Sequence, residues 1–360
     1  SLEDSKALVL AKCRALLRGY DARWRDAGYR ALPGQVENTM TSALWNPATD
    51  RSSRSFVVAG KLDVFAELNG RRYIFDHKTT SDDIEDPDGP YWRQLRVEGQ
   101  ATHYMLLQWL NGVKPDGAVW DVVRKPSISP KKLTKAERAS CVADRKYFGT
   151  SMSMDTLAAL QTGERETLEM YEARLTYDCT VERPERYFQR RPVPRLDHEI
   201  LEYAEDLWQH GQNILASRKI ARLPKNSGAC MLYGSPCKFL GICSGHDSPE
   251  SDRWRRREIR HSELGGVVGK QDALTNSRVR CFQTCPVKHR FEYELCLERQ
   301  DEEEKETLYF GSAYHEGLAA WWEAFTLEDS NGDSEQESPA IAVGNGDAEA
   351  EFSARDSHGG

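Results

Sequence analysis

The sequence predicts an α/β protein in which helices flank a central mixed β-sheet. Three observations support this prediction: two short alternating segments around an Asn-Gly dipeptide, a further strand-like segment, and several long runs with the composition of helices. The chain has 360 residues, 39% of them hydrophobic, so it can hold one large domain or two modest domains with proper cores.

Helical runs alternate with strand-like segments along the chain. Ala, Leu, Arg and Lys dominate residues 4–31, which are therefore expected to form the first helix. Further helices are predicted over residues 91–111, 154–174, 198–218, 276–298 and 310–325, and a further strand over residues 117–123.

The most informative segment is a β-hairpin predicted over residues 57–79. Asn69 and Gly70 lie between two alternating runs, which is the strongest short-range signal for a two-residue hairpin turn. Counting outward from that turn by equal steps makes Asp63 the direct cross-strand partner of Asp76. Directly opposed residues have Cβ atoms roughly 4.5–5.5 Å apart, so the two carboxylates are expected to share one face.

Lys78 joins the carboxylates because side chains two apart on a strand point the same way. The opposite face is expected to be core, with Leu62, Val64, Ala66, Tyr73 and Phe75. Opposed like charges destabilise a hairpin, and a divalent cation between them, Mg²⁺ or Mn²⁺, would offset this. The alternative is an exposed sheet face on which the carboxylates pair with Lys61, Arg72 or Lys78.

A candidate surface for nucleic acid lies within residues 179–195. Arg186, Arg190 and Arg191 interleave there with aromatic residues, a pattern that suits phosphate contacts and base stacking. A solvated edge strand beside a Pro-rich turn explains the same residues equally well.

The nine cysteines favour metal or cluster binding over disulfides. Cys230, Cys237 and Cys243 form a compact knuckle over residues 230–243 that has too little apolar content to fold alone. Cys285 is the best candidate for a fourth ligand, with Cys281 in reserve. Four thiolates fit either a structural zinc or a [4Fe-4S] cluster, and spacing does not separate the two.

The charge is unevenly distributed. Nine acidic residues and one basic residue lie between Thr326 and Gly360, so this tail carries all of the net charge of −8. We expect disorder over residues 326–360. The other predicted units are a core over residues 1–245, a flexible connector over 246–275 and a helical segment over 276–325.

Four motifs together resemble the RecB-type branch of the PD-(D/E)xK nuclease superfamily, especially phage and CRISPR-associated exonucleases that carry an iron–sulfur cluster. They are Gly60-Lys61-Leu62-Asp63, Asp76-His77-Lys78-Thr79-Thr80, Gln100-Ala101-Thr102-His103-Tyr104 and the three clustered cysteines. The resemblance implies a restriction-endonuclease-like core with a cysteine staple, and it covers about 180 residues of this chain.

The resemblance also implies roles for single residues. Asp63, Asp76, the backbone carbonyl of His77 and the imidazole of His315 would bind one or two divalent cations. Lys78 would orient or activate the attacking water. Gln100 and Tyr104 would reach the metal site or the DNA backbone. Glu37 carries only a weak signal for shaping the site.

One part of this pattern is out of order. The segment that normally comes first in such nucleases comes last here, as Ser277 to Pro286 and Gly311 to His315. A circular permutation explains this with nothing duplicated, and it makes residues 276–325 the completion of the same core. A truncated second copy and a chain assembled from fragments are the alternatives.

These observations predict a metal-dependent DNA exonuclease acting in phage or bacterial recombination, repair or CRISPR adaptation. DNA with single-stranded ends is the expected partner, with a possible protein partner in those pathways. The alternative function is a non-catalytic DNA-binding or adaptor module with a structural zinc. No apolar run approaches a membrane span and the N-terminus lacks the order of a signal peptide, so a cytoplasmic location is expected.

Overall fold

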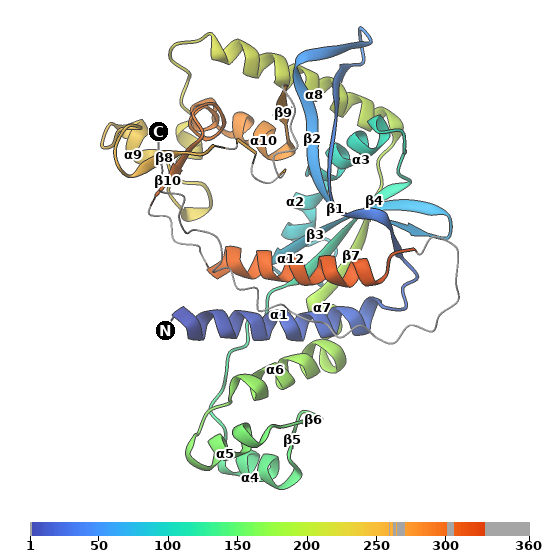
Figure 1. The fold of residues 1–360 in the computed structure, drawn as a ribbon, viewed down its shortest axis with the longest axis vertical. Helices are drawn as coiled ribbons and strands as arrows, with labels where there is room; N and C mark the ends of the chain where they lie inside the picture. Colours follow the sequence, from blue (N-terminus) through green and yellow to red (C-terminus); the bar gives the residue numbers. More distant parts are fainter. Residues whose placement is uncertain (1, 259, 262–263, 265–270, 301–305, 328–360) are drawn as a thin grey trace, which may run out of the picture.

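The computed structural model describes residues 2–258, 260–261, 264, 271–300 and 306–327. A twisted mixed sheet runs through its centre (Figure 1). Its strands are β1 (Arg30–Asn46), β2 (Arg51–Leu68), β3 (Arg71–Thr80), β4 (Gly117–Arg124), β7 (Phe188–Val193) and β9 (Asp272–Leu274). The order is β1-β2-β3-β4-β7, with β9 pairing in parallel with the early part of β2. Only the β3–β4 and β2–β9 pairs are parallel.

Helices α1 (Leu2–Trp24) and α12 (Glu306–Ala324) cover one face of the sheet. Helix α6 (Leu168–Tyr177) packs against α1. Helices α1 and α12 lie side by side although they come from opposite ends of the sequence (Figure 1). Their apolar side chains form one buried cluster with the sheet, which includes Leu17, Phe75 and Trp322. Burial of this face therefore depends on both helices.

A second set of helices covers the other face. It consists of α2 (Pro90–Arg96), α3 (Gln100–Leu110), α8 (Asp197–Arg218) and α10 (Asn276–Thr284). Residues of all four helices and of the sheet share a second buried cluster, in which Trp92, Leu107, Leu207 and Val279 lie. The predicted α/β class, with a central mixed sheet flanked by helices, is confirmed.

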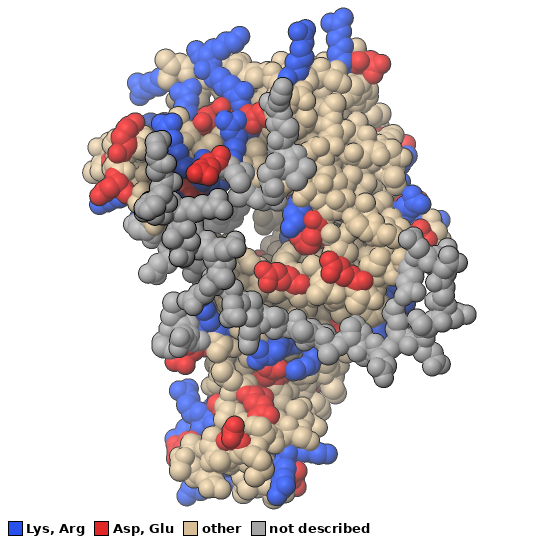
Figure 2. Space-filling model, in the orientation of Figure 1, with Lys and Arg blue, Asp and Glu red and all other residues tan. Residues whose placement is uncertain are grey.

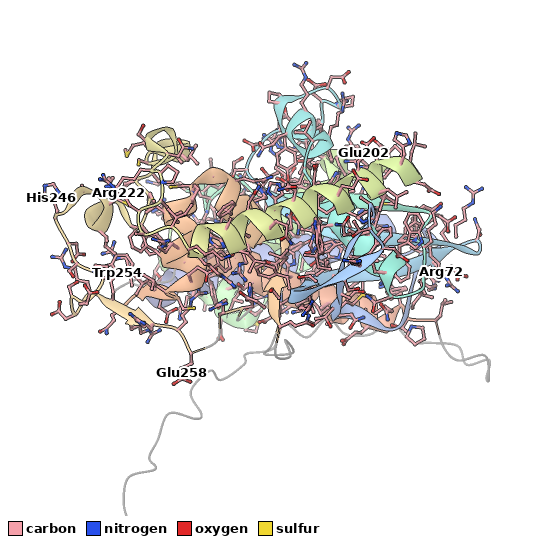
Figure 3. All side chains as sticks on the ribbon, turned by 90° about the horizontal axis from the view of Figure 1, so that it is seen from above. Arg72, Glu202, Arg222, His246, Trp254 and Glu258 are labelled. Atoms are coloured by element: carbon pink, nitrogen blue, oxygen red, sulfur yellow. The ribbon has the colours of Figure 1, made fainter. Side chains whose placement is uncertain are left out.

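Two small units stand apart from these layers. The first projects beyond α6 (Figure 1) and contains α4 (Lys135–Asp144), β5 (Lys146–Tyr147), β6 (Thr150–Ser151) and α5 (Met154–Thr162). The second, here called the cysteine lobe, contains α9 (Leu240–Ser244), β8 (Trp254–Arg256), α11 (Pro286–His289) and β10 (Leu297–Arg299). Trp254 of this lobe and Arg72 of the β2–β3 hairpin lie near opposite ends of the molecule (Figure 3). Figure 2 shows an opening between the lobe and the sheet-bearing part on one face.

The remaining regular segments are short. Helix α7 (Pro184–Tyr187) precedes β7, and single π-helical turns cover Asp178–Glu182 and Arg290–Glu294. Single 3₁₀ turns cover Ser227–Ala229 and Leu232–Gly234.

The predicted helix over residues 4–31 is too long. Helix α1 ends at Trp24, and strand β1, which the sequence did not indicate, begins at Arg30. Pro33 and Gly34 lie inside β1, where the register with β2 shifts between Ala31 and Val36. Proline and glycine normally mark strand ends, so a bulge that contains both makes this strand difficult to predict from the sequence.

Three predicted helices are also divided. The segment 91–111 forms α2 and α3, and the segment 154–174 falls into α5 and α6, with Gly163 capping the end of α5. The segment 276–298 contains α10, α11, a π-helical turn and the start of β10. Composition marked these regions as helical but did not mark the breaks inside them.

The connector predicted over residues 246–275 includes two strands. Strand β8 pairs with β10, and β9 adds to the central sheet beside β2. The predicted acidic tail over residues 326–360 lies, beyond Leu327, outside the described residues.

Candidate active site

The β2–β3 turn follows the predicted geometry. Leu68 pairs with Arg71, so Asn69 and Gly70 form a two-residue loop. Both loop residues have left-handed backbone conformations, with φ of 51° and 76°. This is the type I′ turn that an Asn-Gly pair favours.

The same register brings two carboxylates to the point where the strands separate. The ladder ends at the pair of Val64 and Phe75. One step further outward are Asp63 and Asp76, as predicted. Asp76 is 1% exposed whereas Asp63 is partly exposed, because β3 continues between β2 and β4 while β2 bends away.

Asp76 is the first member of a chain of polar contacts that runs from β3 to α3. The Lys78 Nζ lies 2.5 Å from the Asp76 carboxylate and donates to Gln100 Oε1 at 2.9 Å. Gln100 in turn donates from Nε2 to the Tyr104 hydroxyl at 3.0 Å. Gln100 and Tyr104 are one helical turn apart on α3, so they face the sheet together. The structure therefore gathers these four predicted site residues.

Asp63 lies in a different group. Its carboxylate accepts a hydrogen bond from the backbone N–H of His77 at 2.6 Å. Glu37, Asp63 and His315 each offer a ligand atom, and these atoms lie within 4.8 Å of one another. Among the described residues, this is the group of His, Cys, Asp and Glu side chains that is compact enough to hold a metal ion.

Glu37 was the weakest of the sequence candidates, yet the backbone directs it to the site. Val36 pairs with Val64 and Asn38 with Leu62, so Glu37 is directly opposite Asp63. Glu37 has a φ of 51° at the edge of the β1 bulge. A left-handed conformation in a glutamate is unfavourable and is typical of functional sites.

His315 extends into the group from α12, and Lys61 pairs with Glu37 at its edge. The Lys61 Nζ lies 2.5 Å from Glu37 Oε2. His315 also lies against the ring of His77, with ring centroids 6.1 Å apart and an edge-to-face arrangement. Glu37, Asp63 and His315 are all partly exposed, so a cation from solvent can reach them.

A buried network behind the site explains the position of His77. Its Nδ1 lies 3.3 Å from Asp121 on β4. Asp121 also contacts Arg190 at 3.3 Å and accepts a hydrogen bond from the Tyr20 hydroxyl. Although burial opposes ionisation, Arg190 and His77 lower the pKa of Asp121 to about 2. Asp121 carried no sequence signal beyond its place in a strand.

This network overturns one of the expected DNA contacts. The Arg190 side chain is only 8% exposed and donates to the Tyr20 hydroxyl at 2.7 Å as well as facing Asp121. Its guanidinium also lies 4.3 Å from the centroid of the Trp24 ring. Arg190 is therefore an interior residue that balances a buried aspartate, and it is not available to bind DNA.

Arg186 and Arg191 have different surroundings. Arg186 is partly exposed on α7. Arg191 on β7 places its guanidinium 4.4 Å from the centroid of the Trp92 ring. Both therefore remain accessible in part, and their role in DNA binding stays a prediction.

The electrostatics of the carboxylates suit a cation. Burial raises the pKa values of Asp63 and Asp76, and for Asp76 the nearby charge of Asp63 adds to this. For Lys78, burial disfavours the charge, but Asp76 raises its pKa above the usual value, so the ammonium form persists. Burial, together with the charge of His77, lowers the pKa of His315 to about 4. A neutral His315 can donate its lone pair to a metal.

The residues present fit Mg²⁺ or Mn²⁺. Two carboxylates and one imidazole supply hard oxygen and nitrogen donors with positions left open for water or substrate. Of the predicted ligands, Asp63 and His315 lie in this group, whereas Asp76 is held by Lys78 beside it. The His77 imidazole faces Asp121, and the role of the His77 backbone carbonyl as a ligand stays a prediction.

The four predicted cluster cysteines share one region of the cysteine lobe. The backbone N–H of Cys237 donates to the carbonyl of Cys230 at 2.8 Å. Burial raises the pKa of the Cys243 thiol, and the charges of Cys230, Cys237 and Cys285 raise it further. Cys281, the reserve ligand, is buried on α10. The four thiols have the donor chemistry of a zinc or iron–sulfur site, although among the described residues they do not form a group compact enough to hold a single ion.

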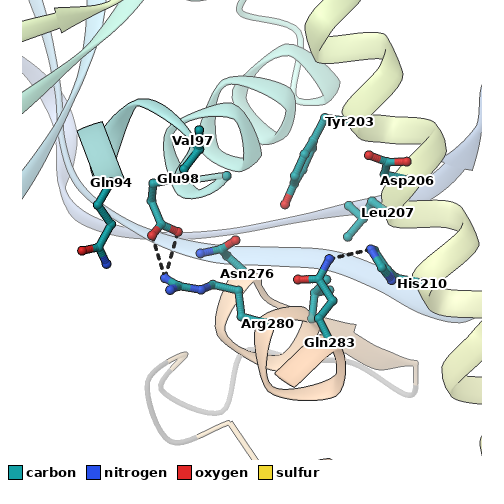
Figure 4. A pocket seen from close by; sticks show the side chains of 12 residues that line it. Gln94, Val97, Glu98, Tyr203, Asp206, Leu207, His210, Asn276, Arg280 and Gln283 are labelled. Carbon is teal, nitrogen blue, oxygen red and sulfur yellow. Dashed lines mark hydrogen bonds and ion pairs between the residues drawn. The ribbon is translucent and has the colours of Figure 1, made fainter. Parts of the chain in front are cut away.

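A pocket of about 360 Å³ lies where α10 meets α8 and the α2–α3 link (Figure 4). Arg280 donates to both carboxylate oxygens of Glu98, at 2.8 and 2.9 Å, and Gln283 contacts His210 at 2.8 Å. An adjoining pocket shares Arg280 and reaches Gln100, which contacts Lys78. The C-terminal segment therefore forms walls close to the acid–lysine group.

None of the helices in the described residues is long and apolar enough to cross a lipid bilayer. No curated protein matches the chain. No solved structure matches it either. One family model, described as the PD-(D/E)XK nuclease superfamily, matches residues 273–354, which is less than a quarter of the chain. Over that segment, which supplies His315 to the site, the chain is similar to the PD-(D/E)XK nuclease superfamily, and its mixed sheet flanked by helices is consistent with the fold of those nucleases.

Proposed function

We propose that this protein is a Mg²⁺- or Mn²⁺-dependent deoxyribonuclease that hydrolyses phosphodiester bonds as an exonuclease. One observation carries the proposal. His315, which lies inside the segment similar to the nuclease superfamily, meets Glu37 and Asp63, which lie outside it. The acid–lysine pair of Asp76 and Lys78 lies on the neighbouring strand. The candidate metal ligands and the Lys78 ammonium thus come together from different parts of the chain.

The residues of the chain divide the chemistry between them. A divalent cation bound by Glu37, Asp63 and His315 would polarise the phosphoryl oxygen and generate a nucleophilic water. Asp76 and Gln100 hold the Lys78 ammonium in place from two sides.

The position of Lys78 suits two tasks. Its remaining donor capacity can orient the attacking water, and its positive charge can stabilise the negative charge that develops on the phosphoryl group. Its raised pKa keeps it charged, which favours the electrostatic task over that of a general base. Tyr104 supports Gln100 from the next turn of α3.

The exonuclease assignment rests on the likeness of the hairpin and α3 motifs to RecB-type exonucleases. The same likeness supports a [4Fe-4S] cluster on Cys230, Cys237, Cys243 and Cys285, with Zn²⁺ as the alternative. It also supports a role in phage or bacterial recombination, repair or CRISPR adaptation, on DNA with single-stranded ends and with a possible protein partner.

We also propose that residues 276–325 complete the nuclease core in circularly permuted order. The packing of α12 against α1 and the burial of Val279 of α10 in the second cluster support this arrangement. A truncated second copy would instead leave the apolar residues of α12 without partners.

The assay that tests the function compares linear and covalently closed DNA. End-labelled linear duplex, linear single strands and a closed circle are each incubated with Mg²⁺, with Mn²⁺ and with a chelator. We expect metal-dependent release of short products from linear DNA only. Discrete cuts in the circle would point to an endonuclease. Binding without hydrolysis under all metal conditions would point to the DNA-binding or adaptor module with a structural zinc.

A further inference from the structure

A second pocket, of about 370 Å³, opens on the other side of the acid–lysine pair. We call it the arginine–tryptophan pocket after its walls, which include Trp92, Arg96, Trp120, Arg191 and Arg195. Among the described residues, the charged side chains that line it are all arginines, and no carboxylate lines it. The pocket of Figure 4 differs, because Glu98 and Asp206 line it. An anion is therefore favoured in the arginine–tryptophan pocket.

Two buried donors of this pocket have no acceptor among the described residues. Trp120 is 3% exposed, and its Nε1 is buried without a hydrogen-bond partner. The Nε of Arg191 is also buried and unpaired. Buried N–H groups are nearly always hydrogen-bonded, and leaving one unpaired is unfavourable. Both residues line the same pocket, and a ligand that supplies acceptor oxygens there would satisfy donors that the described residues leave unpaired.

The pocket adjoins the candidate active site. Trp120 on β4 pairs directly with Asp76 on β3, and neighbouring strands are roughly 4.8 Å apart. The Lys78 Nζ lies 5.4 Å from the centroid of the Trp120 ring. The opposite rim is accessible, because the Arg96 side chain is 62% exposed. A strand with one phosphate beside Lys78 can thus place another in this pocket.

The arginines of this pocket differ in how many of their N–H donors already have acceptors within the protein. Arg195 donates to Thr102 and to two backbone carbonyls, and Arg96 pairs with Asp88. Arg191 has only its stacking contact with Trp92 among the described residues. Arginine binds phosphate through paired N–H donors, and stacking on a ring holds the guanidinium plane in a fixed direction. Arg191 is therefore the residue best prepared to bind the anion.

We infer that the arginine–tryptophan pocket binds a phosphate group of the DNA strand next to the phosphate that is hydrolysed. Arg191 and the Trp120 indole N–H are its principal donors. This inference rests on the proposed nuclease function for the identity of the strand. The pocket would position the DNA and set its binding strength without taking part in the bond-breaking step.

The test measures DNA binding separately from hydrolysis. Binding of a short fluorescent single-stranded oligodeoxynucleotide is followed by anisotropy with Ca²⁺ in place of Mg²⁺, over a range of salt concentrations. For Arg191→Gln we expect about tenfold weaker binding, as for the loss of a hydrogen bond to a charged group. The slope of log affinity against log salt should fall by about 0.7, the value for one phosphate of a single strand.

A matched variant and a second donor variant keep the result interpretable. Arg93→Gln on α2 removes the same charge from an exposed residue that does not line the pocket, and it should leave the affinity nearly unchanged. Trp120→Phe keeps a six-membered aromatic ring but removes the five-membered ring with its N–H, and it should weaken binding by a few-fold. Thermal melting identifies any variant that fails to fold. If Arg191→Gln does not fold, Trp120→Phe decides.

Failure of the inference differs from failure of the proposed function. A folded Arg191→Gln with unchanged affinity and salt slope overturns the inference even if the protein is an active nuclease. Stabilisation by inorganic phosphate that is lost in Arg191→Gln, with DNA affinity unchanged, also overturns it and indicates a site for free phosphate. Absence of metal-dependent hydrolysis in the unmodified protein overturns the function, whereas the anisotropy result still reports on the pocket.

Discussion

His315 on α12 and Asp63 on β2 present their ligand atoms within 4.8 Å of each other, together with Glu37. The two residues come from opposite parts of the sequence and share no element. Their meeting depends on the burial of α12 against α1, where Tyr314, Leu318 and Trp322 are fully buried. Packing away from this group therefore positions one of the proposed metal ligands.

Substitution of Asp76 should abolish hydrolysis without unfolding the protein. Asp76→Asn removes the charge that holds Lys78 and that lies beside the metal group. Several kcal/mol of transition-state stabilisation correspond to roughly a 1,000-fold loss of rate. Hydrolysis of end-labelled DNA measures the rate, and Glu67→Gln on the neighbouring strand is the control. Full activity of Asp76→Asn would remove Asp76 from the site.

Substitution of Glu37 should weaken metal binding. Glu37→Gln leaves the side-chain size nearly unchanged but removes one anionic donor opposite Asp63. We expect Mn²⁺ affinity, measured by calorimetry, to fall by about 10- to 100-fold. Without metal, stability should change by less than about 0.5 kcal/mol, because loss of the like charge opposite Asp63 stabilises the sheet whereas loss of the Lys61 ion pair destabilises it. Unchanged Mn²⁺ affinity would exclude Glu37 as a ligand.

Two glycines of α12 should respond in opposite ways to alanine. A Cβ at Gly317 would overlap the buried Leu17 side chain of α1, whereas a Cβ at Gly311 meets nothing within 4 Å. Gly317→Ala should therefore lower the free energy of unfolding by about 1–3 kcal/mol. Gly311→Ala should raise it by about 0.5–1 kcal/mol, since alanine favours helices. Chemical denaturation measures both, and equal effects would contradict the packing of α12 on α1.

Acid should destabilise the protein through buried neutral histidines. Burial lowers the pKa of His103 to about 4, below the usual value of about 6.5 in the unfolded chain. The unfolded state then binds more protons between these values. The free energy of unfolding should fall as the pH drops from about 6.5 to about 4, by about 3 kcal/mol for this residue.

The contribution of His103 to the pH dependence of stability is measured with a variant. His103→Gln should show a shallower loss of stability over this pH range in denaturation experiments, whereas His198→Gln, at an exposed position, should follow the unmodified protein. Parallel curves for all three proteins would show that His103 does not titrate as expected. His289 should add to the same trend, because burial lowers its pKa to about 3.

Loss of a knuckle cysteine should prevent binding of the iron–sulfur cluster proposed for this lobe. Cys237→Ala is expected to give colourless or insoluble protein after anaerobic purification, because four thiolates are needed to hold the cluster. Cys141→Ala, in the separate unit around α4, should keep the brown absorption and the iron content. Zinc by metal analysis in a colourless unmodified protein would replace the cluster assignment.

Local sequence patterns predicted several elements well. The Asn69-Gly70 turn and the two-residue period predicted the β2–β3 register, which places Asp63 and Asp76 one step beyond the last pair of the ladder, since both signals depend only on neighbouring residues. The helix predicted over residues 198–218 agrees with α8 to within one residue. Strand β1 escaped notice because its bulge places proline and glycine inside a strand.

The sequence by itself determined the hairpin, the acid–lysine motif, the cysteine spacing and the α/β class. Only the tertiary structure decided that Glu37 lies beside Asp63 and His315, that Arg190 is buried against Asp121, and that Trp120 and Arg191 share a pocket. The physical reason is the separation along the sequence of the residues that interact. Turn geometry and strand alternation are local, whereas these contacts arise only when distant apolar faces are buried together and bring their polar neighbours with them.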